Sequence, residues 1–208
     1  MADHPIQEQF GSRVIEAFAS FAREDLDDPA HLEATTFAYV SDARLRRELS
    51  QVFYGARWIY KLGLALLTKS EERAAHVRAQ IVDYAAVCEA LLSYCVSHAI
   101  QNGYMRGTLH QWVDPATKFK PIVWNVGAPD RQLSKQSMWW LAKSALDSQI
   151  ISSGLEAELQ WLREQRNTVH LRARASLGPT AFLNQSKRAF EATVRAVNET
   201  KAWKAAHP

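Results

Sequence analysis

The chain has 208 residues, of which 47% are hydrophobic and 23% are charged, and its formal net charge at pH 7 is +3. This length and composition are typical of a globular protein with a substantial core, and they exclude an intrinsically disordered chain. The small positive charge is compatible with a polyanionic partner but does not require one. The chain has only 8 glycines and 7 prolines, and its abundant Ala, Leu, Arg, Glu and Gln favour helices.

Four amphipathic helices are expected in the first hundred residues, over 6–24, 28–40, 42–66 and 70–100. The first carries apolar residues at spacings of three and four: Ile6, Phe10, Val14, Phe18 and Phe21. The starts of the others are marked by residues that favour helix N-caps: Asp28 before Pro29, Ser41 with Asp42, and Ser70 before two glutamates.

Residues 101–133 interrupt this pattern with closely spaced Gly and Pro turn signals. Within them, segments 108–113 and 121–126 alternate weakly and could pair as a short hairpin. Helices are expected again over 134–152, 154–175 and 179–205, the last two separated by Gly178 and Pro179. The sequence therefore predicts an all-α chain of about seven helices with one irregular, aromatic-rich insertion.

Membrane insertion, secretion and several common enzyme classes find no support. The N-terminal residues lack the basic-then-apolar pattern of a secretory signal, and the longest apolar run, Leu62 to Leu67, is too short to cross a bilayer. Cys88 and Cys95 would lie about 10 Å apart on one helix, too far for a disulfide. We expect both to be small buried side chains in a reducing cytoplasm. The motifs of zinc proteases, P-loop NTPases, dinucleotide-binding proteins and serine hydrolases are absent.

The helix predicted over 154–175 carries the one candidate catalytic motif. On such a helix a set of polar residues shares an arc of about 100° beside the apolar face: Arg163, Arg166, Asn167, His170 and Arg174. Imidazole titrates near neutrality and can act as a general acid or base, and a guanidinium can hold a phosphate. The alternative is a structural one, in which the histidine lies at a packing seam and the arginines pair with Glu156, Glu158 and Glu164 on a solvated face.

Two segments resemble the HEPN superfamily, an all-helical group of nucleotide-binding proteins and endoribonucleases. Residues 81–100, IVDYAAVCEALLSYCVSHAI, are similar to the early HEPN helix that presents a glutamate, here Glu89. Residues 138–173 resemble the helix, turn and motif helix that end in Arg-Asn and then His. The family signature places four to six residues between the arginine and the histidine. Six residues separate Arg163 from His170, as the signature requires, but Arg163 is followed by Glu. Arg166 is followed by Asn167, as is common in the family, but only three residues separate Arg166 from His170. Which arginine plays the family role stays open.

The resemblance implies a HEPN-like up-and-down helical bundle over residues 71–208, with the insertion at 101–133, preceded by an unassigned helical segment over 1–70. It also implies a cytoplasmic, metal-independent endoribonuclease that cleaves single-stranded RNA by attack of the 2′-hydroxyl. His170 would act as the acid–base group, with Arg166 or Arg163 on the scissile phosphate. The family further implies a homodimer in which two motifs share one cleft, and a role as a toxin with a nucleotidyltransferase antitoxin or as a defence effector. The alternative from another class is a non-catalytic HEPN module that binds a nucleotide, an RNA or a protein.

Several other residues have both a functional and a structural interpretation. Glu89 lies on a largely apolar helix, so its carboxylate needs a partner, and a motif arginine is the natural one. An asparagine within a helix competes with the backbone, so Asn167 is expected to make a specific hydrogen bond that orients His170 or ties two helices together. Basic side chains could line a path for RNA, although solvated surface is the default for them: Arg172, Arg174, Lys187, Arg188 and Arg195.

The tryptophans and histidines around the insertion give weaker indications. Trp112, Trp124, Trp139 and Trp140 could stack on unpaired bases, but core packing or a dimer contact is favoured. The spacing of His98, His110 and Asp114 fits no recognised metal site. We therefore expect neither a metal nor another cofactor.

Overall fold

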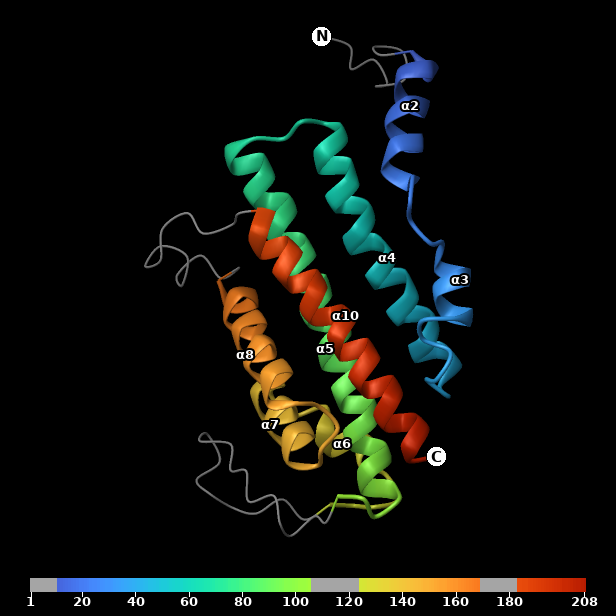
Figure 1. Cartoon of the computed structure of the whole chain (residues 1–208), viewed down its shortest axis with the longest axis vertical. Coiled ribbons are helices and arrows are strands. Elements are labelled where there is room, and N and C mark those ends of the chain that lie inside the picture. The colour runs from blue at the N-terminus through green and yellow to red at the C-terminus, as the bar shows by residue number, and fades with distance from the viewer. Residues whose placement is uncertain (1–10, 106–123, 169–182) are drawn as a thin grey trace.

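Eight helices and no strand occur in residues 11–105, 124–168 and 183–208, the parts of the chain that the computed structural model describes. In chain order they are α2 (Ser12–Arg23), α3 (Pro29–Ala34), α4 (Ala43–Ala65), α5 (Ser70–Gln101), α6 (Asp130–Leu133), α7 (Met138–Asp147), α8 (Ser153–Asn167) and α10 (Leu183–Ala206). The predicted all-α class is confirmed. Figure 1 shows α4, α5 and α10 running side by side, with α7 and α8 along one edge and α2 and α3 along the other.

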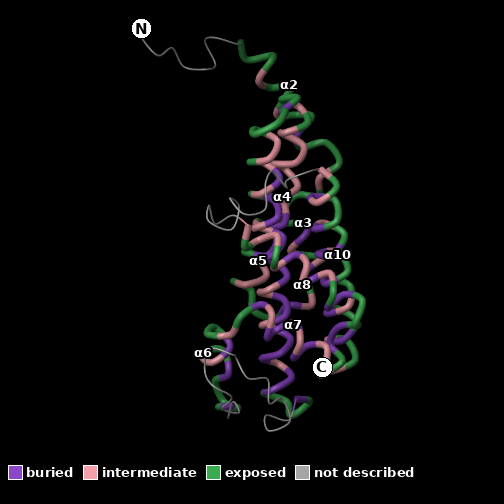
Figure 2. Tube along the Cα trace, turned by 90° about the vertical axis from the view of Figure 1, so that its left-hand side faces the viewer, coloured by how far each residue is buried: buried purple, intermediate pink, exposed green. Residues whose placement is uncertain are grey.

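The central helix is α5, which contacts α4, α6, α7, α8 and α10. By length and composition it is the one helix in the described part of the chain that could cross a membrane, yet 56% of its most apolar stretch is buried by its neighbours. Figure 2 shows buried positions concentrated where these helices meet. Cys88 and Cys95 are free thiols within this core, as expected, and burial raises the pKa of each to about 12.

Aromatic rings join α4 to the rest of the core. The ring of Phe53 on α4 lies 6.2 Å from Tyr84 on α5 and 5.9 Å from Phe190 on α10, measured between ring centroids. Phe37, in the turn before α4, packs on the same ring edge to face at 5.9 Å. Such pairs add to the stabilisation from apolar burial. Residues before 70 therefore contribute to the same hydrophobic core as α5 and α10.

A row of polar contacts runs between α5 and α10. Ser186 donates to the side-chain oxygen of Gln80, and the thiol of Cys88 lies 3.5 Å from the hydroxyl of Thr193. Further along α10, the hydroxyl of Thr200 lies 2.7 Å from that of Tyr39, which belongs to the turn between α3 and α4 rather than to α5. Gln80, Thr193 and Ser186 are buried, so each of these contacts satisfies a polar group that water does not reach.

The predicted helix starts at Asp28 and Asp42 are confirmed. The carboxylate of Asp28 accepts from His31 N at 2.8 Å, and that of Asp42 accepts from Arg44 N at 2.9 Å and from Leu45 N at 3.0 Å. Side-chain oxygens at these positions satisfy backbone N–H groups that the helix leaves unpaired. Ser70 is the first residue of α5 rather than its cap, because Lys69 holds the N-cap position.

Several predicted helix boundaries are wrong. The helix expected over 28–40 ends at Ala34, and the chain turns so that Phe37 and Val40 are buried in the core. The helix expected over 134–152 covers Met138–Asp147, and Gln149, with φ at 55°, then turns the chain toward α8. Residues 130–133, expected to be irregular, form α6. The proposed strand at 108–113 lies outside the described residues, and residues 124–126 belong to no strand.

Candidate functional site

The helix α8 positions the candidate arginines. It begins after Ser152, whose hydroxyl accepts from Leu155 N at 3.3 Å. Glu199 of α10 holds this cap by accepting from the backbone N and the hydroxyl of Ser152 at 2.7 and 3.0 Å. One face of α8 is fully buried through Leu155, Leu159 and Leu162. Since α8 contacts α5, α7 and α10, the rotation of the helix is set and its polar residues have defined neighbours.

Arg166 forms an ion pair with Glu89 across the α5–α8 contact. Its Nη1 donates to Oε2 of Glu89, and the two side chains are 39% and 30% exposed, respectively. The pairing of Glu89 with a motif arginine, expected because a carboxylate on an apolar helix needs a partner, is confirmed. Within the described residues, Glu89 is the one ion-pair partner of Arg166. A guanidinium has five N–H donors, so this contact leaves Arg166 with donors for an anion.

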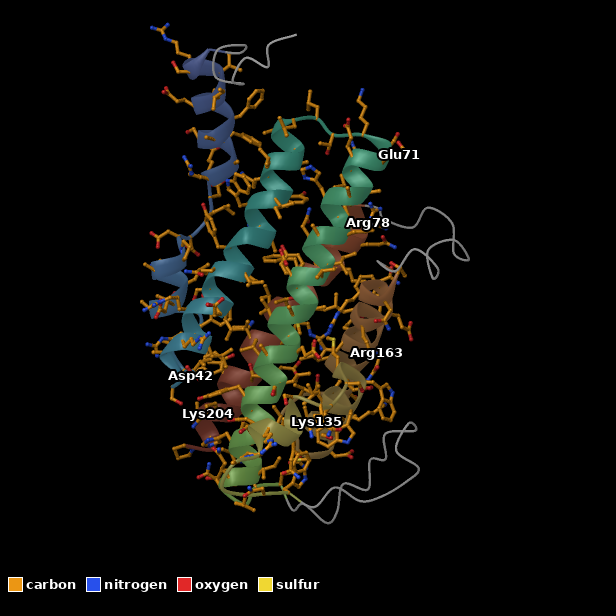
Figure 3. The ribbon with its side chains drawn as sticks, turned by 180° about the vertical axis from the view of Figure 1, so that it is seen from behind. Asp42, Glu71, Arg78, Lys135, Arg163 and Lys204 are labelled. Atoms are coloured by element: carbon orange, nitrogen blue, oxygen red, sulfur yellow. The ribbon has the colours of Figure 1, made fainter. Side chains whose placement is uncertain are left out.

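Arg163 makes its contacts along α8 instead. Its Nε donates to Gln160 at 3.1 Å, and its Nη2 lies 3.6 Å from Glu164. Gln160 in turn donates to Glu156 at 2.9 Å, and Glu156 pairs with Lys143 of α7 at the same distance. Figure 3 labels Arg163 on the outer helix α8. The structure thus separates the two arginines, since Arg166 reaches α5 whereas Arg163 belongs to a polar chain along α8 and α7.

The expected polar arc is observed only in its first part. Asn167 is the last residue of α8 and is exposed, so the expectation that it lies in the middle of a helix is corrected. The backbone N of Thr168 donates to the carbonyl of Gln165 at 3.1 Å, and its hydroxyl donates to the same oxygen at 2.7 Å. A shortened last turn of this kind is common where helices end. His170, Arg172 and Arg174 lie outside the described residues.

Three basic residues of α10 have acidic partners. Arg188 contacts Glu158 through Nε at 2.7 Å and through Nη2 at 3.3 Å, and its guanidinium lies 4.1 Å above the ring of Trp161. Lys187 lies 3.8 Å from Glu191, and Arg195 lies 3.5 Å from Glu199. These pairs fit the default expectation of a solvated helix face.

The tryptophans near the insertion serve the core. Trp124 and Trp140 are 8% and 1% exposed, and their ring centroids are 5.4 Å apart. Trp139 is partly buried and packs against the same core. The favoured expectation of core packing is confirmed for these three residues, whereas Trp112 lies outside the described residues.

His98 belongs to an aromatic cluster that the sequence did not indicate. It contains the rings of His98, Tyr104, Trp203 and His207, and the five contacting pairs among them have centroid distances of 4.5 to 6.1 Å. Nε2 of His98 lies 2.9 Å from the carbonyl oxygen of His207, and Nδ1 lies 3.1 Å from the amide nitrogen of Asn102. This arrangement fits a neutral ring with its proton on Nε2. Burial lowers the pKa of His98.

No metal site is found among the described residues, which contain no group of three or more His, Cys, Asp or Glu side chains placed to hold an ion. His110 and Asp114, considered with His98 from the sequence, lie outside them. A groove of about 470 Å³ runs between the start of α4, the end of α5 and α6. In it the hydroxyl of Ser97 donates to Asp130 at 2.6 Å, and Tyr94 contacts Ser41 at 3.1 Å.

No protein-family model, curated protein or solved structure matches this chain. Evidence for the chemistry of the candidate site therefore comes from the contact between α5 and α8 and from the sequence motif of Arg166, Asn167 and His170. The ion pair of Arg166 with Glu89 is the part of the candidate site that the structure describes in full, since His170 lies outside the described residues.

Proposed function

We propose that this protein is a HEPN-like, metal-independent endoribonuclease that cleaves single-stranded RNA. The observation that carries the proposal is the ion pair between Glu89 on α5 and Arg166 near the end of α8. It brings together two segments whose sequences resemble the two HEPN motif helices, and it holds a half-exposed guanidinium four positions before His170. Arg166 rather than Arg163 is then the phosphate-binding arginine, since Arg166 is held at the α5–α8 contact by Glu89, whereas Arg163 contacts Gln160 and Glu164 along α8.

In this mechanism His170 removes the proton from the ribose 2′-hydroxyl, and the resulting oxygen attacks the adjacent phosphorus. The bond from phosphorus to the 5′-oxygen breaks, and a protonated imidazole returns a proton to that leaving oxygen. The products carry a 2′,3′-cyclic phosphate and a 5′-hydroxyl. Arg166 offsets the negative charge that develops on the phosphate oxygens. As in the family it resembles, the protein would act as a homodimer in which two motifs share a cleft and supply the acid and the base.

The test uses the purified full chain and a labelled single-stranded RNA in excess EDTA, with the ends of the products identified by mass spectrometry. His170→Ala and Arg166→Ala should each lower the cleavage rate by roughly 10²-fold or more, and Arg163→Ala should lower it far less. Arg188→Ala is the matched control, because it removes the same charge from Arg188 on α10, which pairs with Glu158 on α8. Wild-type protein that leaves the RNA intact, or a His170→Ala variant that cleaves normally, contradicts the proposal.

The role of Glu89 as a positioning residue can be tested separately. Glu89→Gln keeps an acceptor for Arg166 but removes the charge that offsets the guanidinium. RNA should therefore bind the variant more tightly, while the cleavage rate at saturating RNA falls because the guanidinium is less firmly held. A purely structural role for Glu89 would instead lower the melting temperature and leave both kinetic parameters of the folded fraction unchanged.

A second candidate function is a non-catalytic module that binds a nucleotide, RNA or protein. The observation in its favour is that Glu89 already offsets the charge of Arg166, and that Arg166 lies at the C-terminal end of α8, where the helix dipole is negative. Under this alternative, Arg166→Ala weakens ligand binding and the wild-type protein shows no turnover. Measuring RNA affinity beside cleavage in the same preparations separates the two functions.

A further inference from the structure

The helix α2 exposes an apolar stripe. Val14, Phe18 and Phe21 are 44%, 38% and 40% exposed, and their spacing of four and three residues places them on one face of the helix. The adjoining face carries Ala22, which is buried, and Ile15 and Ala19, which are half-buried. Since α4 is the helix that α2 contacts, that second face is the one packed against the bundle. The stripe itself has no covering element among the described residues.

Contacts with α4 fix the C-terminal end of the stripe, at Phe21. The ammonium of Lys61 on α4 lies 4.7 Å from the ring centroid of Phe21 and 3.8 Å from the carboxylate of Asp25. These two contacts hold α2 in a defined orientation on α4. The exposed parts of Val14, Phe18 and Phe21 therefore form a surface of fixed shape. Exposed apolar patches on defined surfaces commonly mark interaction sites.

Two opposite charges flank the stripe on the side away from α4. Arg13 lies at the start of α2 and Glu24 directly after its end, and on a helix the two positions lie within about 20° of each other around the axis and about 17 Å apart along it. Both side chains are exposed. Neither has an ion-pair partner within the described residues. The flank therefore carries one positive and one negative charge, at opposite ends.

We propose that this stripe binds a second copy of the same chain, with the two α2 helices antiparallel about a two-fold axis near Phe18. In a two-fold contact the same surface of both copies meets, and the two α2 helices run in opposite directions. The stripe of one copy then covers the stripe of the other, and Arg13 of each copy faces Glu24 of its mate. An anionic membrane surface would require a predominantly basic rim, whereas this rim is neutral and complementary to itself.

This interface is independent of the proposed ribonuclease activity. Figures 1 and 3 show α2 and α8 on opposite edges of the bundle, with α4, α5 and α10 between them. The α2 contact therefore lies away from the cleft that two motif helices would share. Arg166→Ala should leave association through α2 unchanged, so that failure of one proposal is distinguishable from failure of the other.

The test is sedimentation velocity of the full chain over a range of concentrations. Wild-type protein should associate reversibly, and Phe18→Glu should lower the mass of the assembly, at concentrations where the wild type is associated, to at most that of the dimer formed through the shared motif cleft. Leu66→Glu is the matched control, because Leu66 is 51% exposed at the end of α4 and lies outside the stripe; it should associate like the wild type. Melting curves establish that each variant is folded.

Charge reversal tests the arrangement itself. Arg13→Glu and Glu24→Arg each replace two attractive contacts by two repulsive ones and should weaken association roughly tenfold or more, whereas the double variant should recover most of the wild-type affinity. The inference is overturned if the wild type has the mass of one chain at every concentration, if Phe18→Glu associates normally, if Leu66→Glu dissociates equally, or if the double variant stays as weak as the single ones.

Discussion

The contribution of the Glu89–Arg166 pair to stability can be worked out from its exposure. Fully exposed ion pairs contribute about 0.2–1 kcal/mol, whereas removing one partner of a buried pair costs about 3–5 kcal/mol. With 30% and 39% of the two side chains exposed, Arg166→Ala should lower the free energy of unfolding by about 1–2 kcal/mol, which is an intermediate value. In a Glu89→Ala background the same change should cost about 1 kcal/mol less, and this difference is the coupling energy.

The assay is urea denaturation of the wild type, the two single variants and the double variant, at low salt and in 1 M NaCl. The control cycle uses Lys187 and Glu191, which are 76% and 59% exposed and 3.8 Å apart. Its coupling should be about 0.3 kcal/mol and should vanish in high salt, where the screening length is about 3 Å. The Glu89–Arg166 coupling should survive in part because the pair is half-buried. Equal coupling energies in the two cycles would refute the claim that Glu89 holds Arg166 in place.

Three further predictions concern the core and the aromatic cluster. Leu159→Ala should lower the free energy of unfolding by about 2–5 kcal/mol, because the side chain is fully buried; a loss below 1 kcal/mol in urea denaturation would contradict the packing described. Burial raises the thiol pKa of Cys88 and Cys95 to about 12, so Ellman's reagent at pH 8 should label neither in the folded protein and both in urea. Burial lowers the pKa of His98, so the unfolded chain binds the proton more readily, and stability present above the ordinary value of about 6.5 should fall as the pH drops below it. Melting temperatures of the wild type should show this fall, and those of His98→Gln should show less of it.

The sequence predicts those features that depend on local chemistry. Asp28 and Asp42 are recognisable as N-caps because a side-chain carboxylate before a helical pattern has a specific partner in the first turn. The ion pair of Glu89 is predictable because a carboxylate on an apolar helix is costly without a counter-charge. The core positions of α8 follow from the periodicity of Leu155, Leu159 and Leu162.

Features that depend on distant parts of the chain are not predictable in this way. The early end of α3 places Phe37 against Phe53, and no local signal reports that contact. His98 meets His207 across 109 positions of sequence, so neither residue stands out by its neighbours. The end of α8 at Asn167 is similar, because the pattern of Arg166, Asn167 and His170 continues to suit a helix beyond the residue where the described helix ends.

The polar contacts between α5 and α10 have a consequence for the alignment of the two helices. The face of α10 toward the core is rich in small residues, with Ala189, Ala192 and Ala196 all buried, and such a smooth face would fit α5 in several positions one turn apart. Sliding α10 by a turn would separate Ser186 of α10 from Gln80 of α5, and each of these buried side chains would lose its hydrogen-bond partner at a cost of about 1–3 kcal/mol. These few hydrogen bonds therefore select one position of α10 along α5 from several that apolar packing alone would allow.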